Sequence, residues 1–251
     1  MELTRKSFQG VLNILRFNRH FYAVATAILL AVILFNKVFP NAIRNFLIAG
    51  ALLVLFGMIF SLFVSFYIYD VSDLYRLKWL EDSGQGKILN IHAGFDETST
   101  IIRNKFPGAN LIVCDFYDAA KHTELSIKRA RNIYPPDPRV ISVRTDRLPF
   151  PDNTFDKSLS ILSAHEIRSD IERVQFFLEL SRITKPSGQV FITEHLRDLN
   201  NFLAYTIGFF HFYSRKCWFR TFKRSNLTVK QEFKTTPFVT TFVLERNGNT
   251  V

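Results

Sequence analysis

The sequence is poor in cysteine, in acidic residues and in repetition, and each shortage narrows what the chain can be. Its two cysteines, Cys114 and Cys217, lie far apart, so they predict neither a disulfide framework nor a cysteine-based metal site and fit a reducing compartment. Only 22 Asp and Glu stand against 32 Lys and Arg, which leaves a net charge of +10. No internal repeat or low-complexity segment is present. The 251 residues leave room for one ordinary domain and something extra.

Charge is missing altogether from two long runs near the N-terminus. The first covers Phe21 to Phe35, and the second is a stretch of 24 residues from Phe46 to Tyr69. Because about 20 apolar residues cross a bilayer as a helix, we predict transmembrane helices at about 20–39 and 46–69. Neither run has a polar face, which argues against two core helices of a soluble domain. No small-residue cleavage site follows the first run, so we expect an uncleaved anchor rather than a signal peptide.

The basic residues around these runs predict an orientation. Only Lys37 and Arg44 lie between the two predicted spans, and the others flank them on the outer sides: Arg5, Lys6, Arg16, Arg19, Arg76 and Lys78. Since Lys and Arg collect on the cytoplasmic side, both termini and the domain after the spans are expected in the cytoplasm. We therefore divide the chain into a membrane anchor with its connector, residues 1–80, and a second domain, residues 81–251.

From residue 87 onward short apolar runs alternate with segments of helical spacing. The sequence predicts strands at 87–94, 111–115, 140–146 and 189–195, a fourth strand beginning at 155, and helices at 97–106, 119–132 and 169–183. Such alternation is typical of a parallel, doubly wound sheet. The last two strand-like runs, 227–236 and 238–247, have no helix between them and predict an antiparallel pair at one edge. The expected fold is an α/β, Rossmann-like, seven-stranded sheet preceded by a two-helix transmembrane hairpin.

Polar residues gather where the predicted parallel strands end, which is where ligands bind in such sheets. Asp115 follows Gly94 by 21 residues, about the offset at which an acidic side chain accepts the hydroxyls of a ribose. A strand-end Asp is also common as a turn residue or helix cap. The strand-end residues are Asn90, His92, Gly94, Asp115, Asp146, His165 and Glu166.

The segment "LPFPD", Leu148 to Asp152, is followed by Phe155-Asp156 and by the "KPSG" turn, Lys185 to Gly188. This arrangement resembles the core of class I S-adenosylmethionine-dependent methyltransferases, and the resemblance extends over about residues 87–247. It implies S-adenosylmethionine as cofactor, held by Asn90, His92, Gly94, Asp115, Asp146 and Arg147.

The first loop departs from the family's pattern. Gly94 is present, but His92 and Asp96 stand where two further glycines are usual. Glycine there allows positive φ and close approach of the backbone to the ligand. The departure leaves an alternative open, namely an inactive methyltransferase-like membrane scaffold. A nicotinamide-dependent oxidoreductase is a third possibility, which the missing glycines and the antiparallel tail disfavour.

Methyl transfer needs an acceptor held in line and, for some acceptors, a general base. His165 and Glu166 are the candidates for that base, and the opposing interpretation gives them only a structural role in the loop. His195, after the fifth strand, is a weaker candidate. No metal site is expected, because His92, His122 and His211 show no metal-ligand spacing with these residues.

The segment 199–224 combines nine aromatic residues with a local excess of Lys and Arg. Such a segment suits a membrane interface, although a helix packed on the sheet with a solvated basic end is the alternative. Its place after the fifth strand implies a hydrophobic acceptor. The sequence therefore favours a membrane-anchored methyltransferase of a lipophilic small molecule or lipid. No nucleic-acid partner is expected, and the sequence predicts no oligomeric state.

Overall fold

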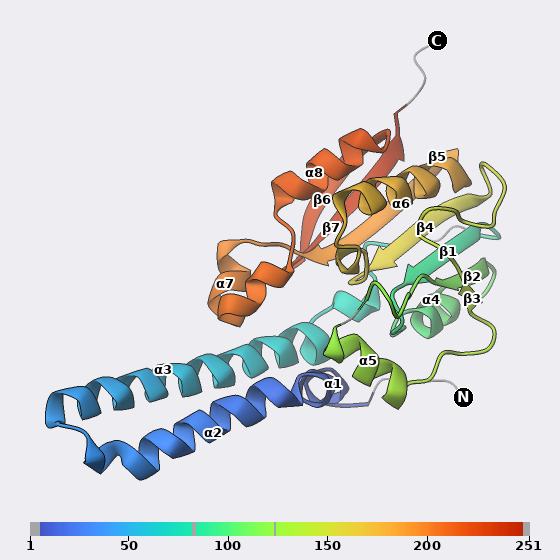
Figure 1. Ribbon diagram of the computed structural model, residues 1–251. Coiled ribbons are helices and arrows are strands. Elements are labelled where there is room, and N and C mark those ends of the chain that lie inside the picture. Colours follow the sequence, from blue (N-terminus) through green and yellow to red (C-terminus); the bar gives the residue numbers. More distant parts are fainter. Residues whose placement is uncertain (1–5, 82–83, 123, 248–251) are drawn as a thin grey trace.

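The computed structural model describes residues 6–81, 84–122 and 124–247 and consists of an α/β domain from which a helical hairpin projects (Figure 1). Arg5, which contributes to the predicted orientation, lies outside the described residues. So do Asp82 and Ser83 of the connector and Thr123 of a predicted helix.

The seven strands form one sheet in the order β3-β2-β1-β4-β5-β7-β6. The first five are parallel, whereas β7 runs antiparallel to both β5 and β6. The sequence analysis predicted this α/β sheet with its C-terminal antiparallel pair, and the structure confirms it. The strands are β1 (Lys87–His92), β2 (Asn110–Asp115), β3 (Ile141–Ser142), β4 (Phe155–Ile161), β5 (Thr184–His195), β6 (Leu227–Thr236) and β7 (Val239–Arg246).

Alternating side chains of the strands enter two cores, one on each face. On the first face α6 (Asp170–Ile183) and α8 (Arg215–Arg224) cover the sheet, and their Phe177 and Trp218 are fully buried. On the second face α4 (Ser99–Lys105) and the connector cover it, with Ile102 and Leu80 buried. Ser169 caps α6 by accepting a hydrogen bond from the backbone N–H of Glu172, as its position before the apolar run predicts.

Three predicted boundaries were wrong. The strand expected at 140–146 is limited to β3, because Arg144 and Arg147 pair in a turn directly after it. The "KPSG" turn belongs to β5, which continues through it with a shift of register opposite β4. Gly188 permits this, since a Cβ there would lie 2.8 Å from the carbonyl oxygen of Asp156.

The helix expected at 119–132 is shortened to α5 (Leu125–Ile133). Asp118 diverts the chain before it, because its carboxylate accepts from the N–H of Ala120 while its own N–H donates to His122. Such local hydrogen bonds compete with a helix.

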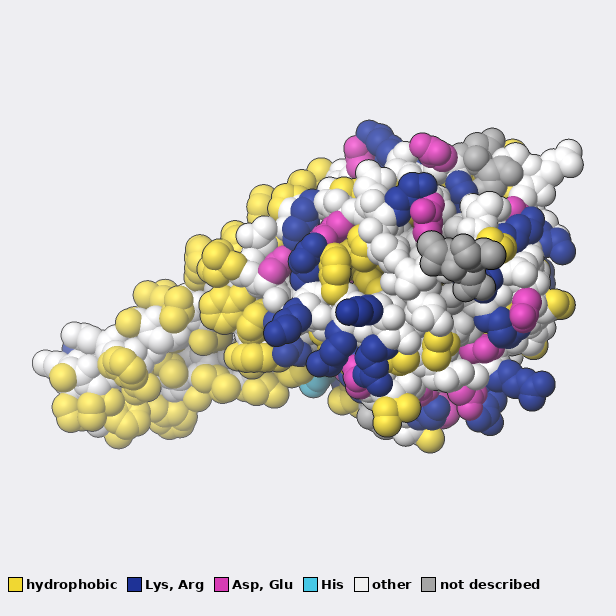
Figure 2. Space-filling model, turned by 90° about the horizontal axis from the view of Figure 1, so that it is seen from above, with side chains coloured by type: hydrophobic (Ala, Val, Ile, Leu, Met, Phe, Trp, Pro, Cys, Tyr) yellow, Lys and Arg dark blue, Asp and Glu magenta, His cyan; other side chains and the backbone are white. Residues whose placement is uncertain are grey.

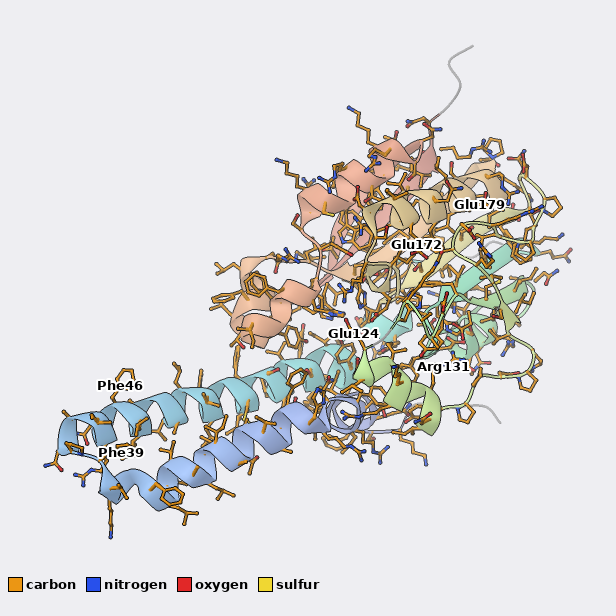
Figure 3. The ribbon with its side chains drawn as sticks, in the orientation of Figure 1. Phe39, Phe46, Glu124, Arg131, Glu172 and Glu179 are labelled. Atoms are coloured by element: carbon orange, nitrogen blue, oxygen red, sulfur yellow. The ribbon has the colours of Figure 1, made fainter. Side chains whose placement is uncertain are left out.

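The hairpin consists of α2 (Arg19–Phe35), a 3-10 turn (Asn36–Val38) and α3 (Asn41–Phe66), and it is almost entirely exposed and apolar. Phe39 and Phe46 lie at its far tip (Figure 3). One helix, the continuous stretch Asn41–Arg76, is long and apolar enough to cross a membrane. The α2 helix, with 17 residues, is about 26 Å long and falls short of a bilayer of roughly 30 Å by itself. It bends by 72° from α1 (Gln9–Phe17). The second predicted span is thus supported by length and composition, and the first stays a prediction.

The connector between α3 and β1 is structured and contributes buried side chains. It forms a π-helical turn (Tyr67–Val71) and a 3-10 turn (Leu74–Arg76), and Leu74, Leu77 and Leu80 are completely buried. The Asp70 carboxylate accepts hydrogen bonds from the first backbone N–H groups of α1. The hairpin is therefore packed firmly against the α/β domain.

Candidate functional site

The carboxyl ends of the parallel strands point toward the base of the hairpin (Figure 1). At the end of β1, Gly94 adopts φ 88°, which explains why this one glycine is present. The buried Asn90 donates to the hydroxyls of Thr98 and Ser99 at the start of α4. The Asp96 carboxylate also faces the start of α4 and accepts hydrogen bonds from the backbone N–H groups of Thr98 and Ser99. Asn90 and Asp96 thus both hold the start of α4 in place.

His92 and Asp115 are paired neighbours at the ends of β1 and β2. His92 is 6% exposed, and neither ring nitrogen has a hydrogen-bond partner. Asp115 is equally buried and forms an ion pair with Arg131 of α5, with 2.5 Å between Nη1 and Oδ2. The guanidinium also lies over the Tyr117 ring and reaches toward the Gly94 carbonyl oxygen. Arg131 thus fills the space beside Gly94, where a Cβ would lie 3.0 Å from its Cδ.

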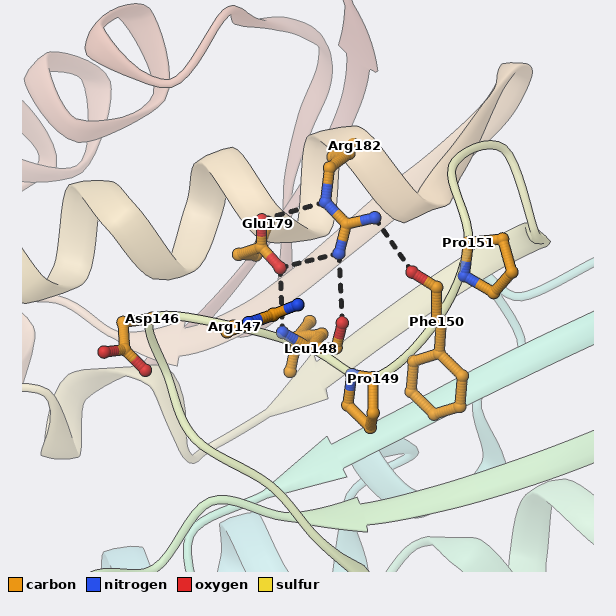
Figure 4. A pocket seen from close by; sticks show the side chains of 8 residues that line it. All are labelled: Asp146, Arg147, Leu148, Pro149, Phe150, Pro151, Glu179 and Arg182. Atoms are coloured by element: carbon orange, nitrogen blue, oxygen red, sulfur yellow. Dashed lines mark hydrogen bonds and ion pairs between the residues drawn. The ribbon is translucent and has the colours of Figure 1, made fainter.

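Asp146 and Arg147 lie apart from this group, after β3. The Asp146 carboxylate is held by Arg144 at the surface, and that ion pair lowers its pKa to about 2. Both residues border a shallow pocket of about 480 Å³, in which Glu179 and Arg182 bond with each other and with the backbone of Leu148 and Phe150 (Figure 4). There Glu179 accepts from the Leu148 N–H, and Arg182 donates to Glu179 and to the carbonyl of Phe150. The arrangement anchors the "LPFPD" segment to α6, and the predicted adenine contact of Asp146 stays a prediction.

His165 and Glu166 lie on the 3-10 turn Ala164–Glu166 that follows β4, and both are buried. Glu194 of β5, which is fully buried, accepts a 2.6 Å hydrogen bond from Nδ1 of His165. Nε2 of His165 lies 3.3 Å from Oε1 of Glu166. His211, from the 3-10 helix Thr206–His211, brings its Nε2 to 3.7 Å from the same oxygen.

The charges of this cluster decide which group can accept a proton. Burial alone lowers the pKa of His165, but the charge of Glu194 and the hydrogen bonds to Glu166 and Glu194 outweigh it and raise the pKa to about 10. Burial raises the pKa of Glu166, but the contacts with His165 and His211 outweigh it and hold that pKa well below its usual range. His165 therefore keeps its proton at neutral pH, and Glu166 is ionised beside it.

Two residues of this region, Arg131 and Glu194, were not predicted from the sequence, and His211 was considered there only as a metal ligand and rejected. None stands in a motif, and only the fold brings them to the strand ends. His195, the weaker candidate base, is hydrogen-bonded to residues outside this cluster. Its Nε2 bonds with the hydroxyl of Tyr69 at 2.9 Å and its Nδ1 with Asn201, so it joins the base of the hairpin to β5.

The aromatic and basic segment 199–224 divides into two parts. The first part, α7 (Leu199–Tyr205) and the following 3-10 helix, packs against α3 and leaves large apolar side chains in the open: Leu199, Phe202, Leu203, Ile207 and Phe210. The second part, α8, is an ordinary helix that buries Trp218 and Phe222 on the sheet. Its arginines pair with acidic neighbours: Arg215 with Glu232, and Arg224 with Asp170. Figure 2 shows the apolar side chains over the hairpin and the adjoining flank, with Lys and Arg gathered on the α/β domain.

Residues 90–192 match the family model described as a methyltransferase domain. The match covers less than half of the chain and indicates a methyltransferase-like domain over these residues. No curated protein matches the sequence.

Solved structures resemble the methyltransferase-like domain at low sequence identity. A S-adenosylmethionine-dependent methyltransferase from Aquifex aeolicus is 14% identical, with a TM-score of 0.51, 71% of this chain and 92% of that chain being covered. A type 11 methyltransferase from Sulfolobus solfataricus is 21% identical, with a TM-score of 0.43 and coverages of 66% and 87%. Geranyl diphosphate C-methyltransferase from Streptomyces coelicolor A3(2) is 14% identical, with a TM-score of 0.47 and coverages of 66% and 74%. The Aquifex likeness establishes the methyltransferase fold.

Proposed function

We propose that the chain is a membrane-anchored methyltransferase that acts on a lipophilic small molecule or lipid. One observation carries the proposal. The exposed apolar surface of α2, α3 and α7 adjoins the edge of the sheet at which a methyltransferase-like fold binds its ligands. An acceptor dissolved in a bilayer would therefore reach this edge without crossing water.

The residues at the ends of β1 and β2 fit the cofactor. His92 has two buried ring nitrogens without a hydrogen-bond partner, whereas most buried polar groups in proteins have one. Asp115 offers an acidic acceptor for the ribose hydroxyls, and the Gly94 backbone beside it is covered by the side chains of Arg131 and Tyr117. Arg131 has to withdraw from Asp115, and its side chain is long and a quarter exposed. When bound, S-adenosylmethionine supplies an electrophilic methyl group.

The side chains after β4 and β5 are suited to the acceptor. Glu166 is ionised and can accept a hydrogen bond from a hydroxyl of the acceptor. The protonated His165 beside it stabilises that carboxylate and makes it a weak base, so the pair is suited to orienting the acceptor rather than to deprotonating it. Glu194 fixes the orientation of the His165 ring. The main contribution of the protein is then to hold the acceptor in place among apolar side chains.

The hairpin supports membrane anchoring through its surface. No residue of α2 is buried, and in the most apolar window of the Asn41–Arg76 helix only 6% is buried. Large exposed apolar patches are rare on soluble proteins and mark interaction sites. A length of about 39 Å for the 26 residues of α3 is sufficient to cross a bilayer. With Lys37 and Arg44 near the tip and more basic residues at the base, the α/β domain would face the cytoplasm.

Isothermal titration of the full chain in detergent with S-adenosylmethionine tests the enzyme assignment. Wild type is expected to bind, and Asp115→Ala is expected to bind much more weakly because it lacks the ribose acceptor. Asp137→Ala is the matched control, since Asp137 is an exposed carboxylate that pairs with Arg139. A wild-type chain that binds no cofactor would remove the proposal.

A further inference from the structure

The cluster after β4 contains the donor set of a metal site. His165, Glu166 and His211 each offer one ligand atom, and these atoms all lie within 4.8 Å of one another. His211 comes from the 3-10 helix that follows α7, so two separate segments of the chain are needed to assemble the group. Two imidazoles and one carboxylate form a ligand set that binds zinc and related divalent transition metals.

The spacing of the donors agrees with such a site. Ligand atoms at about 2.05 Å from a tetrahedral metal lie roughly 3.3 Å apart. Oε1 of Glu166 lies 3.3 Å from Nε2 of His165 and 3.7 Å from Nε2 of His211. The two imidazole rings face the same carboxylate oxygen, with 5.0 Å between their centroids and 74° between their planes. All three donor atoms lie within 4.8 Å of one another, so the two imidazoles have to approach each other for all three to reach one ion.

Each imidazole is also oriented from behind by a carboxylate. Glu194 receives the Nδ1 hydrogen of His165 at 2.6 Å and accepts from the His165 backbone N–H as well. Glu124, at the N-terminus of α5, lies 3.1 Å from Nδ1 of His211. Metal-bound histidines almost always donate their second ring N–H to such an acceptor, which fixes the tautomer that leaves Nε2 free for the ion. This pairing distinguishes the cluster from a chance meeting of surface histidines.

One cation lies against the cluster. Arg168 donates to the His211 carbonyl and to Glu124, and its Nη2 lies 2.5 Å from Nδ1 and 2.9 Å from Nε2 of His211. It is more than a third exposed and can swing outward. Around the cluster the carboxylates Glu124, Glu166 and Glu194 outnumber this guanidinium, so the balance of fixed charge favours a divalent cation.

We propose that His165, Glu166 and His211 bind one divalent transition metal ion, of the zinc class, through Nε2, Oε1 and Nε2. The ion takes the place of the Nε2 proton of His165. A three-residue ligand set leaves room for an exogenous ligand, which, on the function proposed above, would be an anionic oxygen of the acceptor.

The test is a titration of zinc into the chelator-treated full chain in detergent, without S-adenosylmethionine. Wild type is expected to take up one equivalent. His211→Ala and Glu166→Gln each remove a ligand and should weaken zinc binding by more than 100-fold. Glu194→Gln removes the support of His165 and should weaken it by about 10–100-fold. Arg168→Gln should bind zinc at least as tightly as wild type, because it removes the competing cation.

His20→Ala serves as the matched control, since His20 lies on α2 far from the cluster and should leave zinc binding unchanged. Circular dichroism of each variant checks the fold, and two independent ligand variants keep the test open if one of them unfolds. A wild-type chain that takes up no stoichiometric zinc, or folded His211→Ala and Glu166→Gln chains that bind as wild type does, would overturn the proposal. Because cofactor is absent from the titration, its failure leaves the methyltransferase proposal standing.

Discussion

Replacing Arg131 by alanine is expected to tighten the binding of S-adenosylmethionine. In the structure the Arg131 guanidinium pairs with Asp115, the carboxylate that we propose accepts the ribose hydroxyls, and rests on the Tyr117 ring with 4.3 Å between its carbon and the ring centroid. The cofactor has to displace these contacts before it can bind. Arg131→Ala removes that step.

The size of the effect follows from the contacts. A hydrogen bond to a charged group contributes about 1.5–3 kcal/mol. Arg131 is 24% exposed and keeps part of its interaction with water after it withdraws, so the lower end applies. About 1.5 kcal/mol corresponds to roughly a tenfold gain in affinity. Without cofactor the same variant leaves Asp115 buried without its cationic partner, with the Tyr117 N–H still donating to it, so the free energy of unfolding should fall by about 1–3 kcal/mol.

Isothermal titration of wild type, Arg131→Ala and Lys128→Ala measures this directly. Lys128 is an exposed cation on the same helix and controls for the loss of one positive charge. Weaker binding by Arg131→Ala would refute the reasoning, because it would make Arg131 a ligand of the cofactor. Equal changes in both variants would reduce the effect to long-range electrostatics.

Three further results are expected. Burial lowers the pKa of His195 to about 4 in the folded state, whereas the unfolded state has a pKa of about 6.5. The unfolded state therefore binds a proton first, so the stability that neutral His195 contributes is present above pH 6.5 and is lost as the pH falls toward 4. In urea unfolding over that pH range, His195→Gln should lose about 3 kcal/mol less than wild type. Leu53→Asp puts a charge on the exposed face of α3 and should lower the membrane-bound fraction in vesicle flotation, because a charge at the centre of a span costs about 3 kcal/mol. An unchanged membrane-bound fraction would place α3 outside the bilayer. Asp96→Ala removes the hydrogen bonds at the start of α4 and should reduce the free energy of unfolding by about 1 kcal/mol. The affinity for the cofactor should stay unchanged. A large gain in that affinity would mean that Asp96 repels the cofactor.

Strong local patterns made most of the fold predictable. The buried strands β1, β4 and β5 have apolar runs that only a covered sheet can use, and β6 and β7 follow each other too closely for a helix. The boundaries that failed depend on contacts across the fold. The strand β3 is short because it pairs with β2 through two residues only, and β5 continues through "KPSG" because β4 supports it there.

The site was predictable only where it lies on the strand ends themselves. Asp115, His165 and Glu166 follow apolar runs and are visible in the sequence. Arg131 reaches Asp115 from the next helix, and His211 meets Glu166 from 45 positions further along the chain, so no local spacing reports either contact. The buried connector was missed because its three leucines are separated by charged residues that remain at the surface.

The central claim is that this chain transfers methyl groups to a molecule dissolved in the membrane. The most direct measurement incubates vesicles that carry the protein and a total lipid extract with methyl-labelled S-adenosylmethionine, and then counts label in the organic phase. The account predicts label with wild type and with Asp137→Ala and little with Asp115→Ala. Cofactor binding without any transfer of label to the organic phase would contradict it.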